Sequence, residues 1–441
     1  MRYLLTTFAL FAAGAASAQQ AADEVQPERA TQGAFEALSP SVAAAFEAKA
    51  EQQPVEASNW MVAAANPHAV EAGADVLAEG GTAADALVAV QAMLGLVEPQ
   101  SSGLGGGAFL VYYDAGEGLL TTLDGRETAP LAATPRLFQD EAGEPLGFFD
   151  AVVGGRSVGT PGTPALMQEA HSRWGALPWR DLLAPATALA EEGFAVSPRL
   201  AGLVANDAER LARFEPTADY FLPDGAPVQV GDRLVNQAYA DTLTAMARGG
   251  AAAFYSGGIA RDIVATVQGA PGNPGVLSEI DLSLYQVKER APVCATFRAH
   301  DICGMGPPSS GALTVGQILG MLEDKDLSAG PNDPEVRRLI GDASRLAFAD
   351  RGRYMADSDY VPMPTAGLVD PDYLASRAEL LAGPDALTEV APGTPEFDHA
   401  LNFADDASLE LPSTSHFVIV DAAGNVASMT TTIENAFGSR L

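Results

Sequence analysis

The chain has 441 residues, of which 47% are hydrophobic, so it can bury a large core and has neither a disordered nor a membrane composition. It carries 57 Asp and Glu against 25 Lys and Arg, which gives a net charge of −32. An exterior this acidic repels phosphate backbones, so nucleic acid is not expected as a partner.

The first 18 residues have the pattern of a secretory signal peptide. Arg2 precedes an apolar run that ends in Ala-Ser-Ala, and cleavage is expected after Ala18. No other stretch reaches the roughly 18 uninterrupted apolar residues that a membrane span needs. The sequence therefore predicts a periplasmic or secreted protein with no membrane insertion.

Local signals define the first elements after a lead-in. Residues 19–58, rich in Ala, Gln and Glu, are expected to be loosely ordered. Asn66 caps a helix that has Pro at its first position and stops at a Gly pair, and Thr82 caps the next helix. Two strands of a hairpin are predicted over 108–114 and 118–124.

The rest of the chain continues this mixture of helix and strand. Helical patterns cover 164–192, 236–250, 259–269 and 335–355, and the last predicted elements are strands at 414–421 and 426–433. Mixed elements in this order predict helical layers over a sheet core. Because a terminal hairpin would leave an unpaired edge strand, we expect the sequence to be a truncated piece.

The two cysteines are Cys294 and Cys303, in "APVCATFRAHDICGMG". Strand-like runs flank a polar turn between them, so a hairpin can bring the thiols together. In an exported protein a disulfide is the favoured interpretation, with two free thiols as the alternative.

Three short patterns point to other chemistry, and their contexts argue against it. "GLGGGA" at 103–108 is followed by a strand where a dinucleotide loop needs a helix, so a glycine loop that allows close backbone approach is the favoured interpretation. "GRSVG" places Ser157 in an esterase-like motif, but prolines postpone the helix that this motif requires. The five histidines are scattered without metal-ligand spacing, so no metal site is expected.

The C-terminal hairpin brings two threonines together. Pairing Asp421 with Val426 across "AAGN" places Thr414 opposite position 432 or 433, within reach of Thr432. A threonine hydroxyl is a weak nucleophile unless a base such as its own free amine activates it. Thr414 could gain that amine by attacking the carbonyl of Ser413 and cleaving the chain. The plainer alternative is that both threonines are ordinary strand residues.

The segment "STSHFVIVDAAGNVASMTTTIENAFGS" resembles the cleavage and nucleophile region of the γ-glutamyltransferase family, which are N-terminal-nucleophile hydrolases. "GGTAADALVAVQAMLGLVEPQSSGLGGGAFLVYYD", "DGRETAP", "GTPGTPALM", "GGAAAFYSGGIARDIV", "PPSSGALT" and "DASRLAFADRGRYM" follow in the family's order. The resemblance runs from about Trp60 to Leu441. It implies an α+β fold, the four-layer αββα sandwich.

The resemblance also implies roles and subunits. Thr414 would be both the self-cleavage and the catalytic nucleophile, Thr432 its hydrogen-bonding partner, and Arg126 the group that binds the substrate α-carboxylate. Residues 59–413 would form the large subunit and 414–441 the incomplete start of the small one. The implied activity transfers the γ-glutamyl group of glutathione or a related compound to water or an acceptor amine, and this chemistry needs no cofactor.

Two departures from the family pattern keep alternatives open. Glu434 stands where many members have Asn, and a carboxylate would sooner meet a substrate ammonium. The family's oxyanion glycines and an acidic residue that meets the substrate amine have no counterpart among these 441 residues. The alternatives are a cephalosporin- or glutaryl-type acylase of the same superfamily and a non-catalytic exported binding protein.

Overall fold

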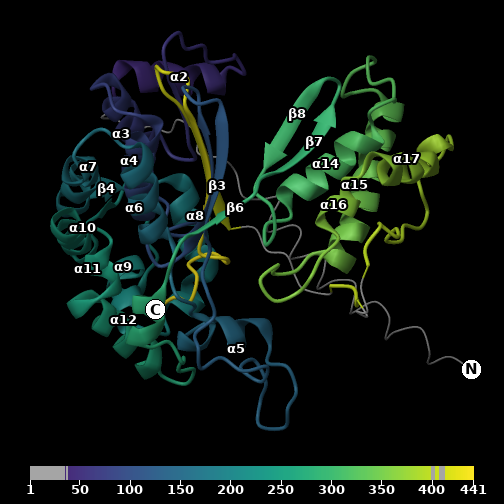
Figure 1. The fold of residues 1–441 in the computed structure, drawn as a ribbon. Coiled ribbons are helices and arrows are strands. Elements are labelled where there is room, and N and C mark those ends of the chain that lie inside the picture. The colour runs from purple at the N-terminus through teal and green to yellow at the C-terminus, as the bar shows by residue number, and fades with distance from the viewer. Residues whose placement is uncertain (1–34, 36–37, 399–402, 407–412) are drawn as a thin grey trace, which may run out of the picture. The chain divides into compact units, whose positions relative to one another are not determined.

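The computed structural model describes residues 35, 38–398, 403–406 and 413–441 (Figure 1). The expected signal peptide, residues 1–18, lies outside them. The chain divides into two compact units. The first takes Met1–Leu119, Asp124–Lys288 and Leu411–Leu441, and the second takes Leu120–Leu123 and Glu289–Glu410.

A six-stranded sheet with the strand order β1-β9-β10-β2-β3-β6 carries the C-terminal hairpin in its middle. Both neighbours of the hairpin, β1 and β2, pair with it in antiparallel fashion. The expected unpaired edge is therefore wrong, because strands from the start of the chain cover both sides of the hairpin. The strands are β1 Met61–Ala63, β2 Gly107–Asp114, β3 Leu119–Gly125, β6 Lys288–Arg290, β9 Thr414–Val420 and β10 Val426–Thr432.

Helices α3 (Pro67–Ala78) and α4 (Ala83–Val97) begin where the capping signals in the sequence place them. The Asn66 side chain accepts from the His68 N–H at the start of α3, and Thr82 forms a capping box with Asp85 at the start of α4. Every residue of α4 except Gly95 is buried. This burial follows from its place between the sheet and α7 (Trp179–Glu192), and α10 (Gln237–Gly249) packs on α7 in turn (Figure 1).

Twelve α-helices of the described residues belong to the first unit. They are α2 Pro40–Ala50, α3 Pro67–Ala78, α4 Ala83–Val97, α5 Phe148–Val152, α6 Thr163–Trp174, α7 Trp179–Glu192, α8 Pro198–Leu211, α9 Glu215–Phe221, α10 Gln237–Gly249, α11 Ala252–Tyr255, α12 Gly257–Gly269 and α13 Glu279–Leu284. Two short strands, β4 Phe194–Ala195 and β5 Arg233–Leu234, pair with each other.

Two sequence predictions need correction. The lead-in contains helix α2, because an alanine-rich run with Pro40 in its first turn is a strong helix former. The predicted helix over 164–192 is two helices, α6 and α7. Gly175 ends α6 and Pro178 lies just before α7, so the pattern breaks between them.

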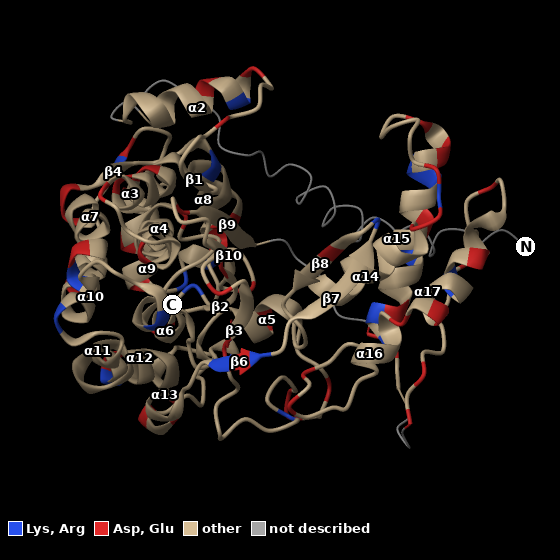
Figure 2. Cartoon of the chain, turned by 45° about the horizontal axis from the view of Figure 1, so that its top comes forward, with Lys and Arg blue, Asp and Glu red and all other residues tan. Residues whose placement is uncertain are grey.

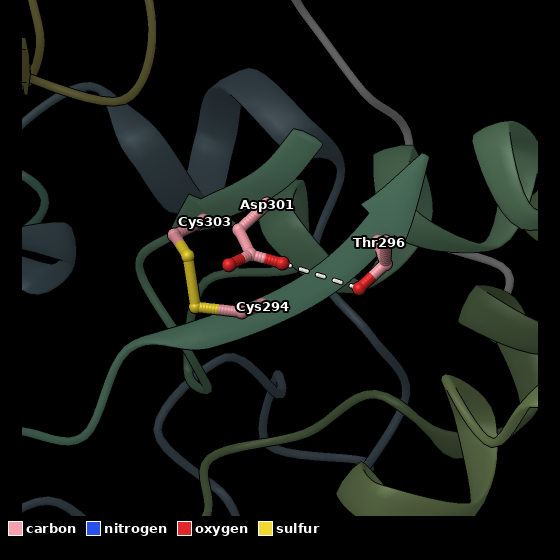
Figure 3. The surroundings of a disulfide bond; sticks show 4 residues. All are labelled: Cys294, Thr296, Asp301 and Cys303. Carbon is pink, nitrogen blue, oxygen red and sulfur yellow. Dashed lines mark hydrogen bonds between the residues drawn. A yellow bond between two sulfur atoms is a disulfide. The ribbon is translucent and has the colours of Figure 1, made fainter. Parts of the chain in front are cut away.

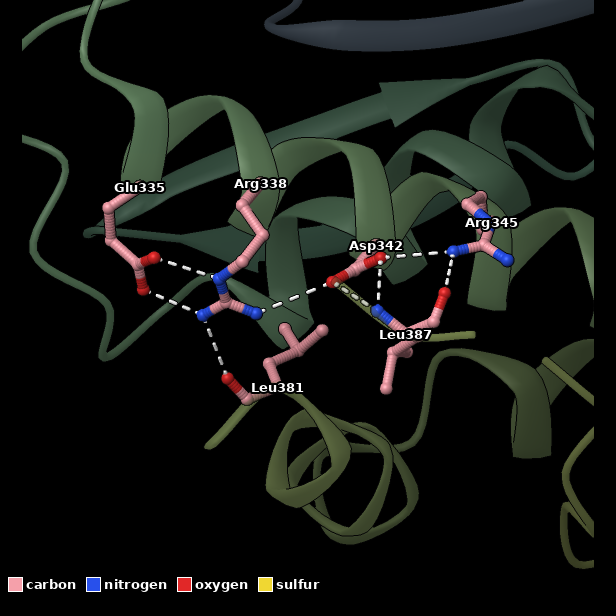
Figure 4. A network of polar contacts seen from close by, with 6 residues as sticks. All are labelled: Glu335, Arg338, Asp342, Arg345, Leu381 and Leu387. Atoms are coloured by element: carbon pink, nitrogen blue, oxygen red, sulfur yellow. Dashed lines mark hydrogen bonds and ion pairs between the residues drawn. The ribbon is translucent and has the colours of Figure 1, made fainter. Parts of the chain in front are cut away.

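The second unit contains α14 Gly311–Met321, α15 Pro334–Tyr354, α16 Thr365–Leu368, α17 Pro371–Ala378 and the hairpin of β7 Val293–Phe297 and β8 His300–Gly304. Its own small core lies mainly between α14 and α15, with Phe297 of β7 and Ala378 of α17 packed against it. Cys294 and Cys303 lie opposite each other on this hairpin and form a disulfide (Figure 3). On α15, the buried Asp342 pairs with Arg338 and Arg345 and accepts from the Leu387 N–H (Figure 4).

Acidic residues are spread along the helices of each unit (Figure 2). Within the described part of the chain, none of the helices combines the length and the apolar content that crossing a bilayer takes.

Candidate active site

The register of the central hairpin pairs Thr414 directly with Thr432, and Val420 with Val426. The predicted pairing of Asp421 with Val426 is therefore off by one position. Asp421 instead belongs to the turn, where its carboxylate accepts from the N–H groups of Ala423 and Asn425. The predicted neighbourhood of the two threonines is present, and the turn is one residue longer.

The strand pleat decides which way the two threonines face. On β9, Ser415, Phe417 and Ile419 are buried and alternate with exposed or half-buried positions. Thr414 is exposed, so it lies on the open face of the sheet. Ser413, just before the strand, is only 8% exposed.

The Thr432 hydroxyl joins the groups around the Ser413–Thr414 peptide bond. It accepts from the Thr414 hydroxyl at 3.0 Å and from the Glu434 N–H at 2.9 Å. It donates to the carbonyl oxygen of Ser413 at 2.9 Å. A continuous chain of hydrogen bonds therefore runs from the Thr414 hydroxyl to the carbonyl of the preceding peptide.

The glycine loop before β2 holds the end of β10 by close backbone approach. A Cβ on Gly106 would lie 2.0 Å from the Thr432 carbonyl oxygen, so only glycine fits there. The Gly106 carbonyl in turn accepts from the N–H groups of Gly162 and Thr163 at the start of α6. The sequence interpretation of "GLGGGA" as a close-approach loop agrees with this geometry.

Arg126 lies beside Glu434, as the two substrate-binding predictions require, but the two side chains already bind each other. Arg126 Nη2 is 2.5 Å from Glu434 Oε2, and Arg126 Nε is 3.1 Å from Glu127 Oε2. Burial raises the pKa of the Glu127 carboxyl, and the neighbouring Arg126 opposes that rise. The Tyr285 hydroxyl donates to the Arg126 carbonyl at 2.7 Å.

A cavity of about 430 Å³ adjoins these groups. Its lining includes Arg126, Glu127, Glu434, Phe148 and Phe437. Thr414 itself is not among the lining residues. The cavity nevertheless lies close to it in the chain's fold, because the lining residue Glu434 follows Thr432, the hydrogen-bond partner of Thr414, by two positions. The cavity has room for a small molecule with a carboxylate at Arg126.

The loop after β10, which lines this cavity, is fixed by a buried ion pair. Arg440 is 3% exposed, and its Nε lies 2.8 Å from Asp207 on α8, while its Nη2 donates to Asn435 at 2.7 Å. Glu434, Phe437 and Arg440 all have positive φ angles, a backbone conformation that costs energy for residues other than glycine. The ion pair with Asp207 stabilises the loop in this conformation.

The alternative motifs do not assemble into sites of their own. The Ser157 hydroxyl donates to the Val152 carbonyl at the end of a single 3-10 turn, and the next helix, α6, begins only at Thr163. Among the residues that the structure describes, no group of three or more His, Cys, Asp or Glu could hold a metal ion.

The sequence reasoning did not find three residues that brace the site, which are Tyr285, Asp207 and Arg440. Tyr285 binds Arg126 across 159 positions and Arg440 binds Asp207 across 233, so no local spacing could have revealed them.

The central threonine pair on a helix-covered antiparallel sheet fits the class of N-terminal-nucleophile hydrolases. The chain matches the sequence model of the gamma-glutamyltranspeptidase family over residues 69–441. It therefore belongs to the γ-glutamyltranspeptidase family, and the predicted family and fold class are confirmed.

Individual relatives agree with this placement. A glutathione hydrolase proenzyme of Bacillus subtilis is 37% identical over 86% of this chain and 65% of its own length. The crystal structure of Helicobacter pylori gamma-glutamyltranspeptidase is 33% identical with a TM-score of 0.75, covering 79% of this chain and all of that one. The cephalosporin acylase from Bacillus halodurans is 28% identical with a TM-score of 0.75, over 88% of this chain and 69% of that one. The chain thus spans slightly under two thirds of the first of these relatives.

Proposed function

We propose that the protein is a self-cleaving γ-glutamyltransferase and glutathione hydrolase, exported to the periplasm or beyond, with Thr414 as its nucleophile. The observation that carries this proposal is the hydrogen-bond chain from Thr414 through Thr432 to the Ser413 carbonyl oxygen. A γ-glutamyltranspeptidase and a proenzyme named glutathione hydrolase are among the relatives.

Self-cleavage begins with attack of Thr414 Oγ1 on the carbonyl carbon of Ser413. The Thr414 proton passes to Thr432 Oγ1, whose own proton moves toward the developing oxyanion. The C–N bond then breaks, the amine of Thr414 takes up a proton, and an ester joins Ser413 to the Thr414 side chain. Water hydrolyses this ester, which leaves a carboxylate on Ser413 and a free α-amine on Thr414 and divides the precursor into two subunits.

Turnover repeats the same chemistry on a substrate. The free amine of Thr414 serves as the base for its own hydroxyl. Thr414 Oγ1 attacks the γ-amide carbonyl, an acyl ester forms, and water or an acceptor amine releases the γ-glutamyl group. Arg126 would bind the α-carboxylate as a guanidinium fork, and Glu434 would accept the α-ammonium. No step requires a metal or an organic cofactor.

A denaturing gel of the full-length gene product tests the proposal. Wild-type protein should give two fragments, with the new N-terminus at Thr414, and Thr414→Ala should remain whole and inactive. A Ser428→Ala variant on the same hairpin is the control and should cleave normally. An unprocessed but folded wild type would favour a non-catalytic binding protein.

A second candidate function is that of a cephalosporin- or glutaryl-type acylase. It is supported by the likeness to the cephalosporin acylase from Bacillus halodurans and by Glu434, which stands where many γ-glutamyltransferases have Asn. Rates on a γ-glutamyl anilide and a glutaryl anilide separate the two. Faster turnover of the glutaryl compound would replace the first proposal with the second.

A further inference from the structure

A buried carboxylate outside the hairpin has an unusual position. Glu98 is fully buried at the C-terminal cap of α4. The C-terminus of a helix carries a partial negative charge, so a carboxylate is disfavoured there. Burial raises the pKa of Glu98, and the opposing contacts with Arg199, Asn66 and Gln100 favour its charged form.

Three side chains from separate segments converge on this carboxylate. Asn66 Nδ2 donates to Glu98 Oε1 at 3.0 Å, Gln100 Nε2 donates to Oε2 at 2.5 Å, and Arg199 Nη1 lies 3.3 Å from Oε2. We call Asn66, Glu98, Gln100 and Arg199 the Glu98 cluster. Residues 98–106 have neither helix nor strand geometry, so these side-chain contacts act together with turn hydrogen bonds, such as that from the Ser101 N–H to the Glu98 carbonyl, to hold this segment in place.

The Glu98 cluster fixes a backbone carbonyl that reaches the cleavage point. The carbonyl oxygen of Gln100 accepts from the Ser413 hydroxyl at 2.6 Å. It also accepts from the Phe437 N–H at 3.2 Å, in the loop that lines the cavity. Ser413 is therefore held on two sides, by Gln100 through its hydroxyl and by Thr432 through its carbonyl.

We propose that Glu98 and Gln100 are positioning residues for self-cleavage, which hold Ser413 so that its carbonyl stays in line with the hydroxyls of Thr414 and Thr432. This inference rests on the proposed self-cleavage. Attack on a carbonyl is sensitive to small misplacements of the reacting atoms, so a restraint on the residue before the cleaved bond speeds the reaction. Once the bond is cut, Ser413 is no longer joined to Thr414, and the restraint has no part in turnover.

The decisive variant is Ser413→Ala, which removes only the hydroxyl that binds the Gln100 carbonyl. A single hydrogen bond of ordinary strength corresponds to a slowing of self-cleavage by about three- to tenfold. The rate is followed by densitometry of the precursor band after dilution from denaturant. Once cleaved, the variant should show wild-type kcat and KM on a γ-glutamyl anilide. Ser413→Thr keeps a hydroxyl and should restore the rate, and Ser428→Ala should cleave as wild type does.

Glu98→Gln tests the cluster itself, because it keeps the side-chain shape but removes the charge that Arg199 neutralises. It should also slow cleavage. Because both changes act on the same restraint, the double variant with Ser413→Ala should slow cleavage, relative to wild type, by less than the product of the two single fold-slowings. Thermal unfolding in a Thr414→Ala background shows whether Glu98→Gln folds; if it does not, Ser413→Ala decides alone.

The outcomes separate the two proposals. Wild-type protein that never cleaves overturns the proposed function and this inference with it. Wild-type and Ser413→Ala proteins that cleave at equal rates overturn this inference and leave the proposed function standing. A Ser413→Ala protein whose kcat falls along with its cleavage rate also overturns it, because the role would then not be confined to maturation.

Discussion

Replacing Glu434 with Gln tests how Arg126 is shared between the protein and a substrate. Glu434 Oε2 lies 2.5 Å from Arg126 Nη2, so a substrate carboxylate has to compete with a carboxylate of the chain. Glu434→Gln removes that charge and keeps the size of the side chain. The same change removes the carboxylate that would bind a substrate ammonium.

The size of the effect follows from the exposure of the pair. The side chains of Arg126 and Glu434 are 37% and 75% exposed, so water and salt screen their attraction. Exposed pairs of this kind typically contribute about 0.2 to 1 kcal/mol, which corresponds to a change in affinity of about 1.4- to fivefold. The stability of the protein should therefore change little, and glutarate, which has carboxylates and no amine, should bind about 1.4- to fivefold more tightly.

A γ-glutamyl substrate should respond in the opposite direction, because it carries the ammonium that Glu434 would accept. Inhibition constants for glutarate and KM values for a γ-glutamyl anilide are measured on cleaved protein. Glu117→Gln, an equal change of charge at an exposed turn, is the control and should alter neither value. If glutarate binds no more tightly in Glu434→Gln, or if both ligands move in the same direction, the competition for Arg126 is refuted.

Three further changes test other contacts. Thr432→Val should slow self-cleavage by about 10²- to 10³-fold, which is the usual effect of removing one hydrogen-bond donor to an oxyanion. Cleavage near the wild-type rate on a gel would contradict the hydrogen-bond chain. Gly106→Ala should lower the unfolding temperature and block cleavage because its Cβ meets the Thr432 carbonyl, whereas Gly103→Ala, with open space around it, should do neither. Replacing Cys294 and Cys303 by Ser should lower the free energy of unfolding of the second unit by about 2–3 kcal/mol in urea titrations, and equal stability with and without reductant would argue against the disulfide.

Local chemistry explains what the sequence could predict. The capping residues Asn66 and Thr82 fix the starts of α3 and α4, because a cap acts on amides within three residues of itself. The pair Thr414–Thr432 follows from the short turn between two strands, where counting residues sets the register. The error of one position arose because Asp421 uses its carboxylate to close the turn.

The remaining features depend on segments that are distant in sequence. The Ser413 hydroxyl and the Gln100 carbonyl are separated by 313 positions, and no spacing rule links them. The hairpin's central place in the sheet depends on β1 and β2, which precede it by more than 300 residues. Glu98 looks like an ordinary helix end until Asn66 and Arg199 are placed around it.

The position of Ser413 gives a reason why cleavage must precede turnover in the proposed mechanism. Its carbonyl occupies the place beside Thr432 Oγ1 where a substrate carbonyl would have to lie during attack by Thr414. The Thr432 hydroxyl therefore serves both reactions, first on the chain's own peptide and then on the substrate. While the Ser413–Thr414 bond is intact, the amine that would activate Thr414 is tied up in an amide and the electrophile's place is filled. Cutting that bond removes both obstacles in one step, so a separate activating partner is not required.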